Sequence, residues 1–242
     1  MQLIDGNTGL FAPFAVYTVK PESLGSNAYA LRLLGCAFPV QRGGVLATCN
    51  HLLNNLNTKK EALVVQHPTE SICHHVKVVD RHPKHDFAVL HIEATINSVP
   101  TAIRGELPLA VSSFAYGYYD CTIEDGKLTI IPQVFSGTIT ATPTKFKLKL
   151  QTVFPFYQLS FPCLPGFSGS PLYSDIQQGY ALSGMVFGNE RSEIIERVVT
   201  EYDDGSGRVI EKVGRVFESG VAHTCDAIRG FCDDLNVKIW DS

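Results

Sequence analysis

Apolar residues in this chain gather into short runs that are separated by turn residues. The runs are rich in Val, Ile, Thr, Tyr and Phe, the residue types that favour extended strands. They lie at 28–34, 62–66, 76–79, 87–92, 128–135 and 181–187. Because strands follow one another without helices between them, the pattern predicts an all-β fold, either a barrel or a sandwich.

Only two stretches favour helix: a short turn at 51–55 and the segment 224–235 near the end of the chain. In the second, one side of the helix collects the apolar residues Ala227, Ile228, Phe231 and Leu235. Thr224 is suited to cap the N-terminus of this helix, with Asp226 in its first turn. The sequence therefore predicts a helix that follows the last strand.

Composition narrows the possible functions. The chain has 242 residues, of which 45% are hydrophobic and 18% charged, values typical of one folded domain spanning 1–242. The formal net charge is -4 and no block of basic residues occurs, so a nucleic-acid partner is not expected. No apolar stretch approaches the roughly 20 residues of a membrane-spanning helix, so no membrane partner is expected either.

Cysteine usage indicates a compartment. The seven cysteines are an odd number without a Cys-x-x-Cys pair. Cys225 and Cys232 would be two turns apart on the predicted helix, roughly 10 Å and too far for a disulfide. The opening segment 1–16 has an acid in place of the cations of a secretion signal. Reduced thiols and a cytoplasmic location are expected.

Three short motifs contain the residue types that acyl-transfer chemistry uses. Glycines flank Ser168 in the segment 165–171, which allows a tight turn that exposes the hydroxyl and aims backbone N–H groups at one point. The run 44–48 leads into His51, whose imidazole can accept and return a proton near neutral pH. Asp86 precedes an apolar run, where a carboxylate can orient an imidazole. Each motif alone also fits a surface turn or an ordinary histidine, so only their combination indicates chemistry.

The three residues occur in the order His51, Asp86, Ser168, which is the order of the chymotrypsin-type proteases. The chain resembles the trypsin/chymotrypsin family in its Thr-x-x-His element ending at His51, its Asp-x-Ala-x-Leu element beginning at Asp86 and its Gly-x-Ser-Gly-x-Pro element around Ser168. The segment 35–38 resembles the strand before the histidine in the bacterial HtrA-like and glutamyl endopeptidase-like branch.

This resemblance implies a chymotrypsin-like double six-stranded antiparallel β-barrel with a C-terminal α-helix. The N-terminal barrel would span about 8–105 and the C-terminal barrel about 108–222, with the crossover near 105–111. The helix, at about 224–235, would complete a single trypsin-like peptidase domain.

The same resemblance implies a role for each residue of the three motifs. Ser168 would be the nucleophile, His51 the general base and then acid, and Asp86 the carboxylate that orients it. The backbone N–H groups of Gly166 and Ser168 would form the oxyanion hole. The implied activity is that of a serine endopeptidase that acts on a protein or peptide through an acyl-enzyme, with no metal and no cofactor.

Substrate contacts follow from two further segments, 183–188 and 219–222, which resemble the edge strand that pairs with the substrate and the strand that closes the specificity pocket. The implied substrate-binding residues are Pro162, Cys163, Val186, Phe187, Asn189 and Gly220. Because the pocket positions carry neither an acid nor a base, a small or medium apolar residue is expected before the scissile bond. Phe167 stands where secreted trypsins carry the aspartate of their activation switch, so that switch is not expected here.

Two other functions stay open. A chain with this fold can be a binding or regulatory module, or an enzyme that a regulatory protein partner activates; the predicted hairpin at 193–216 offers a place for such a partner. Ser168, Asp203 and His223 also occur in the order of the α/β-hydrolases. Pro171, however, comes soon after the serine turn, where that family needs a helix.

A zinc site is the remaining alternative. Metal-ligating residue types crowd one region, at Cys73, His74, His75, His82 and His85. Their spacing matches no common structural site, and neighbouring residues of a strand point to opposite faces. A solvated histidine-rich hairpin without metal is expected.

Overall fold

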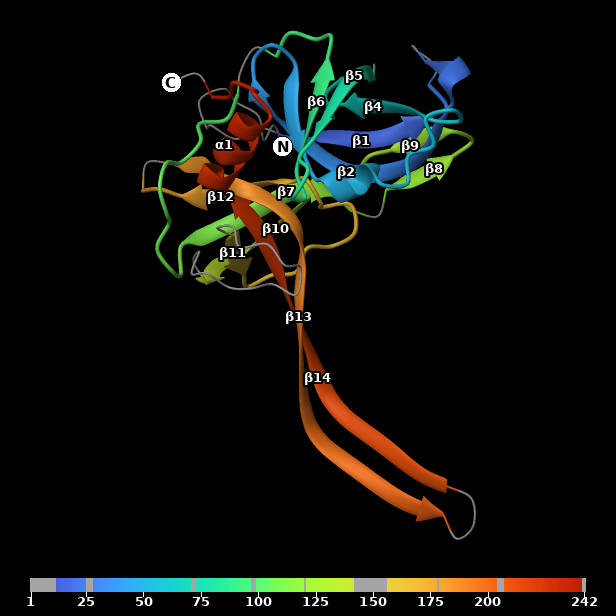
Figure 1. Ribbon diagram of the computed structural model, residues 1–242, viewed down its shortest axis with the longest axis vertical. Coiled ribbons are helices and arrows are strands. Elements are labelled where there is room, and N and C mark those ends of the chain that lie inside the picture. Colours follow the sequence, from blue (N-terminus) through green and yellow to red (C-terminus); the bar gives the residue numbers. More distant parts are fainter. Residues whose placement is uncertain are drawn as a thin grey trace.

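Two closed antiparallel barrels of six strands each form the body of the protein in the computed structural model (Figure 1). The structure describes residues 12–24, 28–70, 73–96, 99–119, 121–141, 156–177, 179–203 and 207–240, and along 192–203 and 207–217 it describes the backbone alone. The predicted fold class, a double six-stranded barrel with a C-terminal helix, is confirmed.

Hydrogen bonds join the strands of each barrel into a closed ring. In the first barrel the order around the ring is β1 (Phe14–Val19), β2 (Ala30–Gln41), β3 (Val45–Thr48), β6 (Ala88–Ile92), β5 (His74–Arg81) and β4 (Ala62–Gln66). In the second it is β10 (Pro132–Ala141), β11 (Phe156–Leu159), β14 (Gly207–Thr224), β13 (Tyr180–Asp203), β12 (Pro171–Asp175) and β7 (Ser112–Tyr118). A separate two-stranded sheet pairs β8 (Thr122–Glu124) with β9 (Lys127–Thr129).

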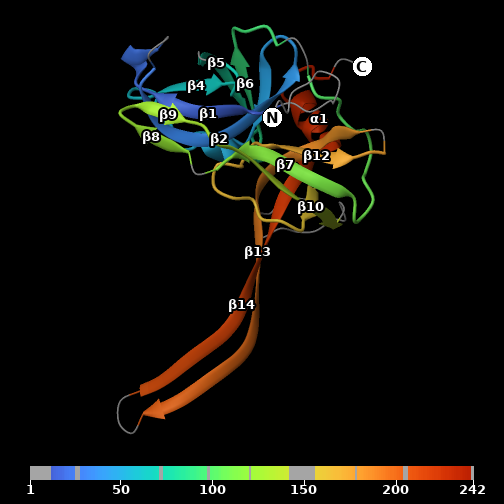
Figure 2. The same cartoon turned by 180° about the vertical axis from the view of Figure 1, so that it is seen from behind.

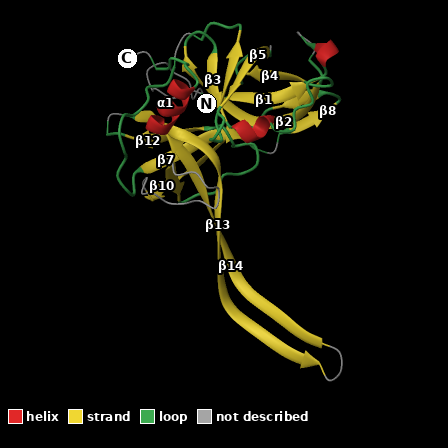
Figure 3. Ribbon diagram, in the orientation of Figure 1, coloured by secondary structure: helices red, strands yellow, loops and turns green. Residues whose placement is uncertain are grey.

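Helical structure is confined to three short elements among the described residues: η1 (Pro21–Ser23), η2 (Asn50–Leu53) and α1 (Cys225–Asp234), shown in red in Figure 3. The run 128–135, expected as one strand, is divided between β9 and β10. Pro132 begins β10, as expected for a residue that lacks an N–H for the strand ladder.

The first strand shows why apolar runs in this chain are continuous rather than alternating. All six residues of β1 are buried. Phe14 and Val16 pack inside the first barrel, whereas Ala15 and Tyr17 belong to a second cluster that includes Tyr118 of β7. Both faces of the strand are therefore buried. A strand with one face in solvent would instead alternate apolar and polar residues.

Helix α1 covers the junction between the barrels (Figure 1). The Thr224 side chain accepts a hydrogen bond from Ala227 N at 3.1 Å, the cap that the sequence predicted. The buried face of the helix joins a core cluster with residues of both barrels, including Phe87 from the first and Leu182 from the second. One apolar core thus fixes the two barrels and the helix against each other.

A long hairpin extends from the second barrel away from the body of the molecule (Figures 1 and 2). It is the outer part of β13 and β14, whose antiparallel pairing runs from Gly184↔Thr224 to Asp203↔Gly207. The predicted hairpin at 193–216 is therefore present, but its strands begin inside the barrel. Within the described part of the chain, no helix combines the length and apolar character that crossing a membrane requires.

Candidate active site

His51 and Asp86 meet because His51 follows strand β3 and Asp86 precedes the neighbouring antiparallel strand β6. Thr48 at the end of β3 pairs with Ala88 at the start of β6, so the turn η2 and the residue before Phe87 lie at the same end of the barrel. His51 Nδ1 is 2.6 Å from Asp86 Oδ2, and the His51 backbone N–H donates to Asp86 Oδ1 at 2.7 Å. Two contacts to one carboxylate fix the orientation of the imidazole ring.

The Asp86 carboxylate is ionised in this environment. Partial burial raises the pKa of Asp86, but the hydrogen bonds and the charge of His51 outweigh burial and hold the pKa below its usual value. The carboxylate side chain is 29% exposed and the imidazole 41%, so the pair faces solvent on one side. An ionised carboxylate on Nδ1 keeps the proton there and leaves Nε2 able to accept one.

The loop that carries Ser168 is held by the opposite barrel. The Cys36 backbone N–H in β2 donates to Ser168 O at 2.8 Å, and the Cys36 thiol donates to Gly166 O at 3.2 Å. Phe167 is 1% exposed and packs edge-on against Phe135, with ring centroids 5.1 Å apart. The phenylalanine at the position of the trypsin activation aspartate is therefore an apolar anchor of the loop.

Two glycines of this loop require their missing side chains. Gly166 has φ +93° and Gly169 has φ +84°, in the left-handed region that favours glycine. A Cβ atom would collide with Tyr118 O at the first position and with Cys36 O at the second. The loop can thus approach the two flanking strands only with glycine at both positions.

Only some of the backbone N–H groups of the loop donate hydrogen bonds to backbone carbonyls. Phe167, Gly169 and Ser170 donate their N–H groups to backbone carbonyls, whereas those of Gly166 and Ser168 make no backbone hydrogen bond within the described residues. Two unused N–H groups two residues apart in a tight turn are what an oxyanion hole needs.

The Ser168 hydroxyl lies beside the Cys163 thiol. Burial raises the pKa of Cys163 to about 12, and hydrogen bonding with the Ser168 side chain opposes that rise. In the part of the chain that the structure describes, no hydrogen bond joins Ser168 to His51. The Ser168 side chain therefore interacts with Cys163 in this arrangement.

The edge of β13 next to this loop is open. Val186 exchanges hydrogen bonds with the loop, from Gly169 N to Val186 O and from Val186 N to Ser170 O, both at 2.9 Å. The pairing of β13 with β12 ends at Met185, whereas its pairing with β14 continues through Asn189. From Gly188 onward, one edge of β13 has no neighbouring strand among the described residues.

Of the residues expected to line the specificity pocket, Asn189 has a role that the sequence did not indicate. Its side chain accepts from Cys163 N at 2.5 Å and donates to Cys163 O at 2.8 Å. Gly220 N donates to Phe161 O at 2.7 Å. Together they attach the segment that contains Pro162 to the strands opposite it, so Asn189 fixes the position of a segment that is expected to line the pocket.

His223 is a neighbour of the site that the motifs did not reveal. It is fully buried, stacks on Phe187 with centroids 4.1 Å apart, and its Nε2 lies 3.3 Å from Asp86 O. Burial lowers the pKa of His223 to about 4, so the ring is neutral near pH 7. No sequence signal marks it, because it stands in β14, far along the chain from the motif of Asp86.

The alternative sites are not assembled. Asp203 lies at the far end of β13, whereas His223 is in the barrel, so the α/β-hydrolase set does not converge on Ser168 (Figure 1). Among the proposed zinc ligands, His74 pairs with Glu70 and His82 pairs with Asp234.

Of the described residues, Cys49, His51 and Asp86 form a group with ligand atoms within 4.8 Å of one another. Burial raises the pKa of Cys49 well above its usual value. In the absence of a metal ion, Cys49 is therefore a neutral thiol at physiological pH.

Comparison with solved structures shows the same fold. HtrA-type protease AlgW with decapeptide is 19% identical, with a TM-score of 0.62 over 96% of this chain and 68% of that chain. AlgW with tripeptide is 22% identical, with a TM-score of 0.60 over 92% of this chain. The Rv3671c protease from M. tuberculosis in its active form is 17% identical, with a TM-score of 0.57 over 98% of this chain and 86% of that chain. The present chain spans 60% of the length of tripeptide-bound AlgW.

Sequence comparison gives the family. No curated protein matches the chain. The family model of the trypsin-like peptidase domain matches residues 35–182, more than half of the 242 residues, and includes His51, Asp86 and Ser168. The chain therefore belongs to the trypsin-like peptidase domain family.

Proposed function

We propose that this chain is a serine endopeptidase that hydrolyses peptide bonds of a protein or peptide substrate with His51, Asp86 and Ser168 as its triad. The observation that carries the proposal is the pair of contacts from His51 to Asp86, at 2.6 and 2.7 Å. They hold the imidazole in the tautomer that leaves Nε2 free to accept a proton.

The reaction proceeds in two acyl-transfer steps. Ser168 Oγ attacks the substrate carbonyl carbon while its proton passes to His51 Nε2, and the carbonyl oxygen becomes an oxyanion between the N–H groups of Gly166 and Ser168. The C–N bond then breaks, and His51 gives the proton to the departing amine. Water attacks the acyl-enzyme with His51 again as base, which releases the acid and restores the serine. No metal or cofactor takes part.

A peptide substrate fits the open edge of β13 as an added strand. The open edge begins after Phe187, close to Val186 and its bonds to the serine loop. That two of the similar structures are AlgW with tripeptide and with decapeptide supports a peptide as the ligand class. The apolar character of Pro162, Cys163 and Val186 supports cleavage after a small or medium apolar residue.

A partner-gated enzyme is the second candidate function. It is favoured by the position of the Ser168 hydroxyl, beside Cys163 and without a hydrogen bond to His51 among the described residues. The hairpin continues the same strand, β13, that contains the open substrate edge. A regulatory protein bound to the hairpin would act on the strand that adjoins the serine loop.

The cysteines support a reducing compartment such as the cytoplasm. Five of the seven are buried free thiols in the structure, namely Cys36, Cys49, Cys163, Cys225 and Cys232. Oxidising compartments favour disulfides in secreted domains of this size.

Labelling with a fluorophosphonate probe tests the proposal, because the probe needs an activated serine and an oxyanion hole but no knowledge of the substrate. The purified chain is compared with Ser168→Ala and His51→Ala, with intact mass and peptide mapping to locate the adduct. We expect one adduct per chain on Ser168, absent from the first variant and strongly slowed in the second. An unlabelled, folded wild-type protein contradicts the constitutive enzyme and directs the search to a partner.

A further inference from the structure

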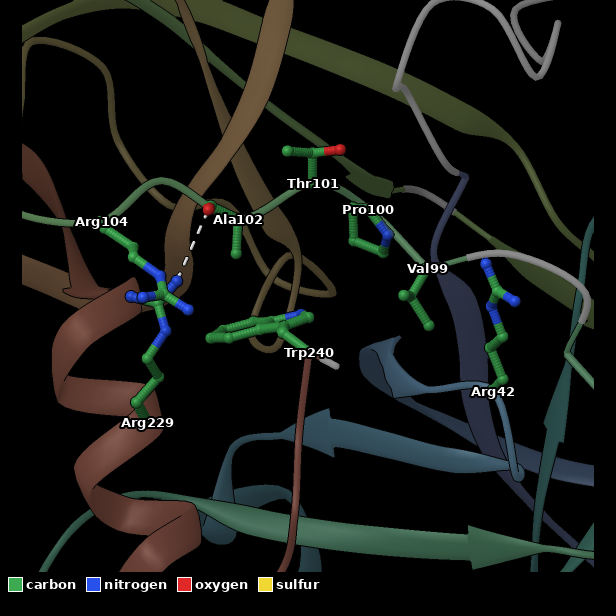
Figure 4. A pocket seen from close by; sticks show the side chains of 8 residues that line it. All are labelled: Arg42, Val99, Pro100, Thr101, Ala102, Arg104, Arg229 and Trp240. Carbon is green, nitrogen blue, oxygen red and sulfur yellow. Dashed lines mark hydrogen bonds between the residues drawn. The ribbon is translucent and has the colours of Figure 1, made fainter. Parts of the chain in front are cut away.

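A cavity of about 380 Å³ lies apart from the serine loop, where the two barrels meet the segment that follows helix α1 (Figure 4). Its walls come from the turn after β2, the segment between the barrels, helix α1 and the chain that follows the helix. The lining residues are Arg42, Val99, Pro100, Thr101, Ala102, Arg104, Arg229 and Trp240. None of them belongs to the candidate active site.

Backbone hydrogen bonds hold the walls of this cavity in place. Leu182 N in β13 donates to Thr101 O at 2.9 Å, and Ile103 N donates to Leu182 O at 2.8 Å. On the other side, Trp240 N donates to Val40 O in β2 at 2.9 Å, and Ile96 N donates to Arg42 O at 2.9 Å. The cavity is therefore a built feature of the fold, fixed to both barrels.

The cavity is cationic although the chain is acidic overall. Three of its eight lining residues are arginines and none is an acid. Arg229 is compensated by Asp226, with Nη1 2.5 Å from Oδ1, and it also donates to Ile103 O at 3.0 Å. Arg42 and Arg104 are exposed, and their guanidinium groups make no hydrogen bond or ion pair within the described residues. Two positive charges around the cavity thus have no counter-charge from the described protein.

Arg104 and Arg229 project into the same end of the cavity (Figure 4). Because Asp226 already compensates Arg229, the Arg104 guanidinium is the group at this end whose charge a bound anion would neutralise. Guanidinium groups bind carboxylate and phosphate oxygens through two parallel hydrogen bonds, which makes arginine the side chain best suited to such anions.

Trp240 adds a flat apolar surface with one polar atom. The Arg229 guanidinium lies 5.0 Å from the centre of its ring. The Trp240 Nε1 atom is buried and has no hydrogen-bond partner within the described residues. A buried N–H without an acceptor is unfavourable, so a ligand oxygen that accepts from it would stabilise the site. Val99, Pro100 and Ala102 supply apolar contacts.

We propose that this cavity binds a small organic anion, with its carboxylate or phosphate group on Arg104 and a flat apolar part against Trp240 and the apolar wall. The volume is within the range of pockets for small molecules. Arg42, on the far side of the indole ring in Figure 4, receives a second polar or charged group of the ligand. The site is independent of peptide hydrolysis, since it shares no residue with the triad.

Trp240 also allows ligand binding to be measured by fluorescence, because it is the one tryptophan of the chain. Its fluorescence is followed while phenyl phosphate, benzoate, inorganic phosphate or neutral benzyl alcohol is added to the full chain. We expect a saturable change with phenyl phosphate or benzoate, weaker binding of inorganic phosphate, and no saturable change with benzyl alcohol. Binding should weaken as ionic strength rises. Comparing phenyl phosphate with benzoate shows which oxyanion the site prefers.

Arg104→Gln should weaken binding of the preferred probe by about tenfold or more, because it removes charge-assisted hydrogen bonds. The control Arg81→Gln removes one exposed charge elsewhere on the first barrel and should leave the dissociation constant unchanged. Both residues are exposed, so both variants should fold.

Two results would overturn the proposal. The first is the lack of a saturable response of the wild type to either organic anion. The second is equal binding of the preferred probe by Arg104→Gln and wild type.

Discussion

Replacement of Asp86 by asparagine tests the triad with the least change of shape. The carboxylate accepts two hydrogen bonds from His51, one from the backbone N–H and one on Nδ1. An amide has one oxygen and one NH₂ group, so it can accept only one of them. If its oxygen stays on the backbone N–H, its NH₂ group faces Nδ1 and forces the ring proton onto Nε2. In that tautomer His51 cannot accept the proton of Ser168.

The expected loss follows from this tautomer. The corresponding change lowers the rate of other Ser-His-Asp proteases by about 10⁴-fold. A factor of 10⁴ equals about 5 kcal/mol of barrier height. The substitution should cost far less in folding stability, because the asparagine keeps one of the two bonds and the site faces solvent. A large loss of rate without loss of fold is therefore expected.

The assay is the rate of fluorophosphonate labelling at neutral pH, with the unfolding midpoint in urea measured on the same samples. Asp80→Asn is the matched control. Asp80 lies 2.8 Å from His91 Nε2 in the same barrel, with side chains 41% and 32% exposed, close to the exposure of the pair in the site. The control variant should label at the wild-type rate. Wild-type labelling by Asp86→Asn, or equal slowing of both variants, would refute the argument.

Three further predictions concern the elements around the site. Gly169→Ala should abolish labelling and should lower the free energy of unfolding by ~1–3 kcal/mol more than Gly105→Ala does. Both glycines have φ near +80°, but only at Gly169 would a Cβ atom collide with Cys36 O. Equal urea midpoints for the two variants would contradict this prediction. Phe167→Ala should lower the free energy of unfolding by about 3–5 kcal/mol, since it empties a buried site, and a loss below ~1 kcal/mol would show that Phe167 does not anchor the loop. The free energy of unfolding should fall by about 3 kcal/mol between pH 6.5 and 4, because over this interval the unfolded chain binds a proton that His223, with its pKa lowered from 6.5 to about 4, does not take up when folded. His223→Gln should flatten this pH profile, and an unchanged profile would exclude His223 as its source.

Much of the architecture could be predicted from the sequence, because it depends on local patterns. Short β-rich runs indicated the strands, and Thr224 with the apolar face after it indicated the terminal helix. The motif order pointed to His51 and Asp86, which the structure brings together at 2.6 Å. The sequence did not predict that 128–135 is divided between two strands, because apolar residues occur throughout this run. Only Pro132 marks the point where the second strand begins.

The surroundings of the site could not be predicted, since they depend on contacts between residues far apart in the chain. Asn189 ties down the Cys163 segment through its side chain, 26 residues away. His223 contacts Asp86 O across 137 residues. An asparagine or a histidine in a strand is common. Neither the composition nor the spacing of the sequence therefore predicts these two contacts.

The proposed nucleophile and the proposed base come from different barrels. For this reason the geometry of the site also depends on residues that belong to none of the three motifs. The first barrel carries His51 and Asp86 at the ends of adjacent strands, where one ladder fixes them. Ser168 belongs to the second barrel, but its carbonyl is held by Cys36 of the first. The distance between base and nucleophile is thus set by the contact between barrels, which one shared apolar core maintains together with α1. A change that loosens this core should lower activity even though it leaves every motif residue in place.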